Sequence, residues 1–339
     1  MPMRAFDKLP MPSKNEAFSR PPDLRKMPSV ASKDALSADE KLRWPWKKST
    51  ARPRHKALEN WPRISVITPS YNQGRFIEQT IRSVIMQDYP NLEYIIMDGG
   101  STDASVEIIK KYEQQLAYWE SQSDRGQSHA INKGFARATG DILCWLNSDD
   151  YFLPDTLQTV GEIFADSTDD FALVGHCIQV YEDGRPPLEA TGKYEGLDRL
   201  LQFWKGYRMH QPSIFWRREV FERVGYLDES LNYTMDFDYW VRIARHFSFT
   251  NIDRALSYST YHAQAKTGDN YASYYDELMR RAPTYWPRTP VLTYYRMKIS
   301  MYWHMVVQPK LRRLRVLAAY YPRRAWSLLS KPFTSQASA

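Results

Sequence analysis

The 339-residue sequence contains few cysteines and no long apolar segment. Its two cysteines, Cys144 and Cys177, both lie in apolar stretches typical of buried strands. Two such thiols do not make a disulfide framework, and they indicate a reducing compartment. No uninterrupted apolar run approaches the roughly 20 residues that a membrane-spanning helix needs. Residues 1–30 are polar and rich in proline, without the apolar core of a signal peptide. The sequence therefore predicts an intracellular, cytoplasmic protein.

Acidic residues are missing from the end of the chain. Residues 278–339 hold 12 Lys/Arg and no Asp or Glu, and residues 1–60 hold 14 Lys/Arg against 7 Asp/Glu. The formal net charge of +7 therefore leaves −12 for residues 61–277. An acidic body with basic ends favours a cation-dependent site in the body and an anionic partner for the ends. Nucleic acid is not expected as that partner, because the acidic body would repel it.

Basic and aromatic residues are interleaved near the end of the chain. Residues 288–333 mix Tyr, Trp and Met side chains with a basic run at Lys310–Arg315. Such a mixture is typical of a helix on a membrane surface, where each clustered Lys or Arg gains about 1 kcal/mol near anionic lipid. We predict that residues 278–339 form a basic helical extension that binds peripherally at the inner face of the cell membrane. The alternative is that these helices pack on the body and expose a solvated basic face.

Residues 1–60 show no sustained hydrophobic periodicity and are rich in Pro, Ser, Lys and Arg. A segment of this composition cannot bury enough apolar surface to offset the entropy cost of ordering. We therefore predict a largely disordered N-terminal arm.

Residues 61–277 alternate between strand-like and helical patterns. Apolar strand-like runs occur at 64–68, 92–97 and 142–146, with helical stripes of apolar residues between and after them. Strands that alternate with helices predict an α/β fold with a Rossmann-like, mostly parallel sheet flanked by helices.

Two adjacent carboxylates follow the strand-like run at 142–146. The run ends in Asn147-Ser148-Asp149-Asp150. In an open α/β sheet, ligands bind beyond the carboxyl ends of the strands. Two carboxylates at such an edge repel each other unless a cation joins them, and a hard divalent cation is the usual one. The alternative is a polar turn in which a carboxylate caps the next helix, and this stretch alone does not separate the two.

Six segments, in this order and at these spacings, carry a resemblance to a known family. They resemble a family 2 glycosyltransferase of the GT-A fold, which is inverting and uses nucleotide sugars. The resemblance spans residues 64 to about 268. Its motifs are Thr68–Asn72 (TPSYN), Asp98–Asp103 (DGGSTD), Asp124–Ser128 (DRGQS) with Ala130–Gly134 (AINKG), Leu146–Asp150 (LNSDD), His210–Ser213 (HQPS) and Met235–Asp238 (MDFD).

The resemblance implies a metal-dependent enzyme that uses Mn²⁺ or Mg²⁺. It would move a sugar from a nucleoside-diphosphate sugar to a hydroxyl of a glycan or lipid-linked acceptor in cell-surface polysaccharide synthesis. Residues 61–153 would be the nucleotide-binding half and residues 154–277 the acceptor half. The residues implied to contact the nucleotide or its sugar are Pro69, Ser70, Tyr71, Asp98, Gly126, Gln127, Asn132, Lys133, Asn147 and Ser148.

The same resemblance implies a metal site. Asn147-Ser148-Asp149 occupies the place of the family's Asp-x-Asp triplet, so Asp149 is expected to bind the metal and Asp150 is a further candidate. His262 by itself is interpreted as a polar residue lining the site, because no other potential ligand lies at a metal-binding spacing from it in the sequence. It also lies in a segment that resembles the family's late loop, which makes it an additional metal candidate. Lys266 in that loop is either a phosphate contact or a solvated side chain.

Two aspartates compete for the role of general base. Asp236 matches the Asp of the family's Glu-Asp pair. Two residues apart on a helix, Asp236 and Asp238 point about 200° from each other. Asp238 has Arg242 four residues on, a spacing suited to an ion pair, whereas Asp236 has Trp240, an apolar platform of the kind sugars stack against. We therefore predict Asp236 as the base. Asp238, Trp240 and His210 are predicted on the acceptor side, with a structural role for Asp238 and a place in the core for Trp240 as the alternatives.

Several of these residues also allow other interpretations. Asp98 and Asp103 could be a turn residue and a helix cap. Asn147 replaces the first Asp of the family triplet, and Met235 replaces the Glu before the base. These departures keep open the main alternative function, a catalytically degenerate nucleotide-binding scaffold in a glycan assembly complex. A nucleotidyltransferase would use a similar sheet and metal but needs no base on the late helix.

Overall fold

The computed structural model describes residues 60–202, 209–266 and 271–286, together with residues 295, 298–300, 302, 303 and 307. The predicted N-terminal arm and most of the predicted C-terminal extension lie outside the described residues. Among the helices that are described, none is long and apolar enough to cross a membrane.

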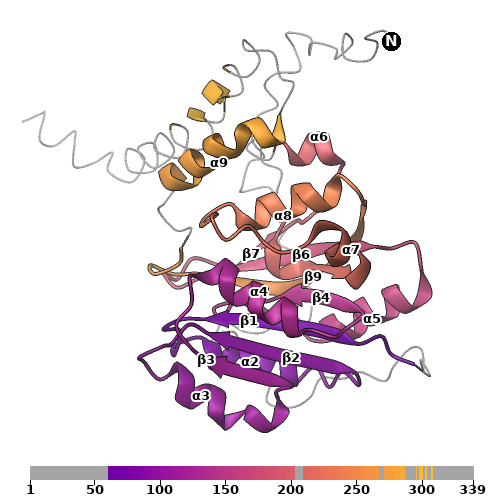
Figure 1. Cartoon of the computed structure of the whole chain (residues 1–339), viewed down its shortest axis with the longest axis vertical. Helices are drawn as coiled ribbons and strands as arrows, with labels where there is room; N and C mark the ends of the chain where they lie inside the picture. The colour runs from indigo at the N-terminus through magenta and orange to yellow at the C-terminus, as the bar shows by residue number, and fades with distance from the viewer. Residues whose placement is uncertain are drawn as a thin grey trace, which may run out of the picture. The chain divides into compact units, whose positions relative to one another are not determined.

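The first half of the domain is a parallel sheet in the order β3-β2-β1-β4. Figure 1 shows these strands in the indigo and magenta part of the chain, with helices beside them. The predicted strands and helices of this half are confirmed. Their bounds are β1 Ile64–Ser70, α2 Ile77–Ile85, β2 Leu92–Asp98, α3 Ser105–Lys111, η1 Glu113–Gln115, β3 Tyr118–Ser121, α4 Gln127–Arg137 and β4 Ile142–Trp145.

The second half extends the same sheet in the order β4-β8-β6-β9-β5, with β7 paired to β6. Strand β8 runs antiparallel between β4 and β6, whereas the long β6 and β9 pair in parallel. The sheet is therefore mixed but mostly parallel, as predicted. The bounds are β5 Tyr151–Phe152, β6 Ala172–Tyr181, β7 Leu188–Ala190, β8 Ile214–Arg217 and β9 Phe249–Tyr261.

The helices of the second half end in α9, which crosses the predicted boundary between residues 277 and 278. Leu278, Ala282 and Tyr285 lie beyond that boundary and are buried. This part of the predicted extension therefore packs in the domain, and Figure 1 shows α9 beyond α8. The bounds are α5 Thr156–Asp166, α6 Leu197–Leu200, η3 Gln211–Ser213, α7 Arg218–Val224, α8 Met235–Ala244 and α9 Tyr271–Tyr285.

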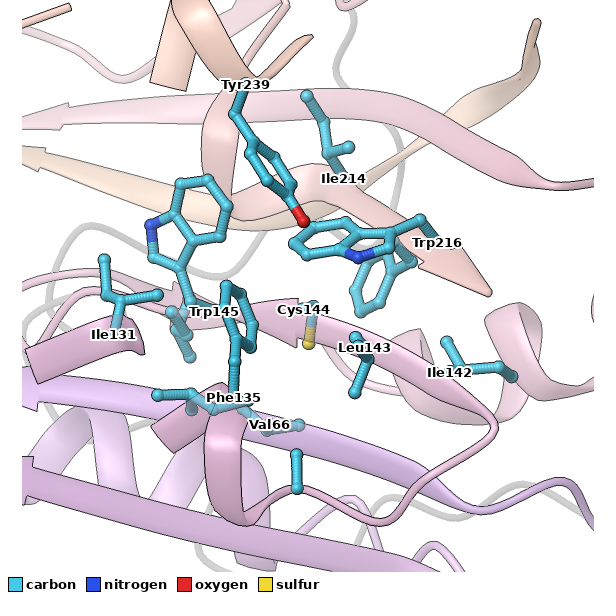
Figure 2. Close-up of a cluster of buried hydrophobic side chains, with 14 of the residues drawn as sticks. Val66, Ile131, Phe135, Ile142, Leu143, Cys144, Trp145, Ile214, Trp216 and Tyr239 are labelled. Atoms are coloured by element: carbon cyan, nitrogen blue, oxygen red, sulfur yellow. The ribbon is translucent and has the colours of Figure 1, made fainter. Parts of the chain in front are cut away.

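Aromatic side chains between β4, β8, α4 and α8 form the centre of the core (Figure 2). Trp145 and Trp216 are 0% exposed, and their ring centroids lie 5.6 Å apart in an edge-on arrangement. Aromatic pairs of this kind contribute about 0.5–1.5 kcal/mol beyond the burial of their area. Gly134 allows α4 to approach β1, because a Cβ there would lie 2.4 Å from Cγ2 of Ile67. The first residue of α4, Gln127, contacts Asn147 just after β4, so the N-terminus of the helix lies near the carboxyl ends of the strands.

Candidate active site

The turn after β4 carries the carboxylates of Asp149 and Asp150, and a side chain of α2 holds its backbone in place. The buried Thr80 hydroxyl donates to the carbonyl oxygens of Ser148, at 2.9 Å, and Asp150, at 2.7 Å. Within the turn, the Asp150 amide donates to the Asn147 carbonyl at 3.0 Å. The backbone is therefore fixed independently of any ligand. Thr80 lies outside the sequence motifs, and nothing in the sequence pattern distinguishes it from an ordinary helix residue.

Asn147 joins three of the sequence motifs through its side-chain amide. Its oxygen accepts from Nε2 of Gln127 at 2.7 Å, and its nitrogen donates to Oε1 of Gln211 at 3.1 Å and Oδ2 of Asp150 at 3.3 Å. Gln211 in turn donates to the Trp145 carbonyl at 2.7 Å. An aspartate at position 147 could make neither donation, since a carboxylate only accepts. The departure from the family triplet therefore fits the neighbours that surround it.

Asp149 faces His262, which directly follows β9. His262 Nε2 lies 3.1 Å from Asp149 Oδ2, and the imidazole packs on the Phe76 ring at a centroid distance of 4.4 Å. The His262 side chain is 1% exposed, so its position is fixed, whereas the Asp149 side chain is 23% exposed. Over the described ranges, no group of three or more His, Cys, Asp or Glu side chains could hold a metal ion. The chain itself offers one carboxylate and one imidazole at this point.

Asp150 is turned towards β9. It is buried, and its Oδ1 accepts from the Thr260 amide at 3.0 Å. Burial and the neighbouring Asp149 carboxylate raise the pKa of Asp150 well above its ordinary value. These contacts give it a role in joining the turn to β9, and its role as a metal ligand stays a prediction.

Asp236 lies in the first turn of α8 and is half-buried. Burial raises its pKa, while the hydrogen bond from the Phe237 amide and the charge of Lys266 act in the opposite direction. Burial therefore outweighs these two opposing contributions to the pKa of Asp236. Lys266 donates to Oε1 of Gln127 at 3.2 Å, so it lies close to both α4 and Asp236.

Asp238 points away from Asp236 and is 1% exposed. It accepts from Nε of Arg242 at 2.9 Å, from Nη2 of Arg281 at 3.1 Å and from the Tyr285 hydroxyl at 3.0 Å. The predicted ion pair with Arg242 is thus present. These contacts enclose its oxygens between α8 and α9 and favour the structural alternative, while its place on the acceptor side stays a prediction.

Trp240 requires a correction. It is 2% exposed and stacks on Trp145 with centroids 5.2 Å apart and an interplanar angle of 9°. The predicted sugar platform is therefore wrong, because the helical spacing that aligns Trp240 with Asp236 directs the indole into the aromatic core.

The ends of β1 and β2 contribute the remaining candidates at this edge of the sheet. Pro69 and Ser70 end β1, and Tyr71 after them is 62% exposed. The buried Ser70 hydroxyl has no hydrogen-bond partner among the described residues. Asp98, by contrast, accepts hydrogen bonds from the Gly100 and Ser101 amides and from the Ser101 and Ser121 hydroxyls. Its carboxylate orders its own loop, and contact with a nucleotide stays a prediction.

The α4 motif divides into residues at the site and residues with structural partners. Gly126 adopts a φ of +112° directly before the helix, which suits glycine. The Asn132 side chain donates to the Leu227 carbonyl at 3.0 Å and accepts from the Leu227 amide at 2.9 Å. Lys133 forms an ion pair with Glu120 on β3. Asn132 and Lys133 therefore tie α4 to its neighbours, and direct sugar contacts by them are not supported.

His210 is half-buried and precedes η3.

Comparison with known proteins gives the family. The model of Glycosyl transferase family 2 matches residues 65–225. The chain is 31% identical over 199 residues to an uncharacterized glycosyltransferase of Mycobacterium tuberculosis (MT1564), covering 54% of this chain and 69% of that relative. It is 37% identical over 135 residues to the putative teichuronic acid biosynthesis glycosyltransferase TuaG of Bacillus subtilis, covering 38% and 52%.

Solved structures show the same fold. S. aureus TarS 1–349 in complex with UDP-GlcNAc aligns with a TM-score of 0.55 at 20% identity, covering 79% of this chain and 76% of that one. The mannosyltransferase PcManGT from Pyrobaculum calidifontis, in complex with GDP-Man and Mn²⁺, aligns with a TM-score of 0.51 at 19% identity, covering 86% and 88%.

The mostly parallel α/β sheet and its alignment with these solved structures give the chain a GT-A-type fold. The chain belongs to glycosyl transferase family 2. The matched region spans about half the length of the first curated relatives.

Proposed function

We propose that this chain transfers a sugar from a nucleoside-diphosphate sugar to an acceptor hydroxyl, with inversion at the anomeric carbon. The observation that carries the proposal is the meeting of three separate segments at one strand edge. Asp149 follows β4, Gln127 begins α4, and Asp236 begins α8, with Lys266 contacting Gln127 and acting electrostatically on Asp236. We further propose that residues 61–153 bind the nucleotide and residues 154–277 the acceptor.

Asp149 and His262 would hold a divalent cation. One carboxylate oxygen and one imidazole nitrogen already converge at 3.1 Å, and both are ordinary ligands of Mn²⁺. The fold neighbour PcManGT is solved with Mn²⁺ and GDP-Man, which supports the choice of metal. When bound, such an ion neutralises the charge that grows on a departing diphosphate. With only two close protein donors, the diphosphate would complete the coordination.

Asp236 would remove the proton from the acceptor hydroxyl as the oxygen attacks the anomeric carbon. A base on the face opposite the leaving diphosphate contributes typically about 10²–10⁴ in rate. Its raised pKa strengthens it for this role, because a carboxylate with a higher pKa holds a proton more firmly. Lys266 supplies a positive charge nearby and would contact a phosphate oxygen.

The acceptor class is proposed as a cell-surface glycan or its lipid-linked precursor. The support is the relative TuaG, whose name places it in teichuronic acid biosynthesis. The scaffold alternative rests on Asn147 and Met235. Both residues fit their surroundings. The side-chain oxygen and nitrogen of Asn147 are both hydrogen-bonded. Met235 is buried, and its sulfur accepts from the Ser128 hydroxyl at 2.8 Å. Neither residue by itself removes a group that the proposed chemistry requires.

A donor screen tests the proposed function. The melting temperature should rise with a nucleoside-diphosphate sugar and Mn²⁺ together, and turnover of that sugar should require the metal. A ligand at about 100 times its dissociation constant adds about 2.7 kcal/mol of stability. Binding without any transfer or hydrolysis, across donors and acceptors, would favour the scaffold alternative. No stabilisation by any nucleoside diphosphate would contradict both.

We also propose that the basic extension binds an anionic membrane surface. Among its described residues, Tyr295, Ile299, Tyr302 and Trp303 are 56%, 69%, 49% and 49% exposed. They are spaced as one face of a helix would require. The surrounding segment carries 12 Lys/Arg and no acid.

The full chain should therefore float with anionic vesicles at low salt and much less at 1 M salt, where the Debye length falls to about 3 Å. Truncation after residue 287 should remove binding and leave transfer to a soluble acceptor, because α9 ends before that point. A full chain that ignores anionic vesicles at low salt contradicts the prediction. An insoluble truncated protein would instead support packing of the extension on the domain.

A further inference from the structure

Glu277 on α9 is a buried carboxylate that contacts the turn carrying Asp236. It is 3% exposed. Its Oε1 accepts from the Tyr233 amide at 2.8 Å and from the Thr234 amide and hydroxyl, both at 2.7 Å. Its Oε2 accepts from the Asn232 amide at 2.8 Å. Three successive backbone amides therefore converge on one carboxylate.

Such a concave set of amides before a helix is a binding site for a negative charge. Here the chain fills it with its own side chain. Burial alone would raise the pKa of Glu277, but the hydrogen bonds outweigh burial and hold its pKa below the ordinary value, so the group stays ionised. Thr234 directly precedes α8, and Asp236 is the second residue of that helix. Holding residues 232–234 in place therefore fixes the start of α8 and, with it, the direction in which the Asp236 side chain points.

The rest of the same face of α9 also contacts α8 and the chain before it. Arg281 and Tyr285 follow Glu277 at intervals of four residues, and both contact Asp238. Arg281 also pairs with Asp228 at 3.0 Å. Polar contacts therefore hold α9 in one register on α8, and this register places Glu277 under the turn before α8.

We propose that Glu277 is a positioning residue for the transfer reaction, holding the turn before α8 so that Asp236 meets the acceptor hydroxyl. The inference rests on the proposed function, since it takes Asp236 as the base. The charge of Glu277 has a second effect. It raises the pKa of Asp236, against Lys266, which lowers it.

The test compares Glu277→Gln with Asp276→Asn, which neutralises an exposed carboxylate on the same helix. Glutamine keeps one acceptor oxygen but loses the charge and the bond to the Asn232 amide. We expect Glu277→Gln to lower kcat by about 10- to 100-fold with the donor KM unchanged, since a displacement of about 1 Å in a reacting group can cost about 10²-fold. The acid limb of the kcat profile should move to lower pH, because the group that raises the pKa of Asp236 is gone. Asp276→Asn should match the wild type in both.

Wild-type kcat and an unmoved acid limb in Glu277→Gln, with Asp236→Asn inactive, would overturn the role of Glu277 alone. An active Asp236→Asn would instead contradict the proposed base. If Glu277→Gln does not fold, Thr234→Val decides. It removes one hydrogen bond to Glu277 but keeps the charge, so kcat should fall several-fold with the acid limb in place. A wild-type kcat in Thr234→Val would then overturn the inference.

Discussion

Asp236→Asn is expected to bind the donor nucleotide as the wild type does and to transfer at most about 10⁻² as fast. The amide cannot take the acceptor proton, and general-base catalysis is worth about 10²–10⁴ in rate. The side chain is half-buried with few contacts to lose, so the melting temperature should change little. Single-turnover rates with saturating donor measure the loss directly.

The pH dependence of the wild-type enzyme provides a second measurement of the same role. Because burial raises the pKa of Asp236, the acid limb of kcat/KM should lie above the ordinary range of an aspartate. Activity should be lost as the pH falls through that value, since protonation removes the base. The comparison variant is Asp238→Asn, which breaks contacts with Arg242, Arg281 and Tyr285 and should lower the melting temperature. Equal loss of transfer in Asp238→Asn at a normal melting temperature would refute the assignment of Asp236.

Asp149→Asn should abolish metal-dependent turnover while leaving the fold intact. The carboxylate is the principal charge that the chain offers to a divalent cation at this edge. The amide of asparagine offers only a neutral oxygen, which binds such a cation more weakly. The backbone of the turn is held by Thr80, which the substitution does not touch. We expect the stabilisation by Mn²⁺ with a nucleoside diphosphate to disappear in a melting experiment, together with transfer. Activity close to that of the wild type would show that the metal site is misplaced.

Two further variants sharpen this test. Asp169→Asn removes an exposed carboxylate away from the site and should behave as the wild type. Asn147→Asp restores the family triplet, yet it should lower activity rather than raise it. The new carboxylate would lose its donations to Gln211 and Asp150 and would place a negative charge beside the buried Asp150. A gain in metal affinity or turnover in Asn147→Asp would contradict the amide network as the reason for this residue.

The sequence alone was sufficient for the parallel part of the sheet and for the edge at which the proposed site lies. Strands such as Ile64–Ser70 and Ile142–Trp145 are short apolar runs, and the polar segments directly after them have to lie at the carboxyl edge. The helical spacing of Asp238 and Arg242 likewise predicted their ion pair, because residues four apart share a helix face. These features are local, so the order of residues along the chain determines them.

Tertiary structure decided which of the side chains predicted from the sequence lie at the proposed site. Asn132 and Lys133 lie in a family motif, yet they contact Leu227 and Glu120, and Trp240 enters the core. Thr80 and Glu277 contribute contacts without a sequence signal, and the long strand β9 brings His262 to Asp149. Apart from the ion pair of Lys133 with Glu120, these contacts join segments that are far apart in the chain. They depend on how α8, α9 and β9 pack in the fold. The periodicity and spacing within a single segment therefore do not predict them.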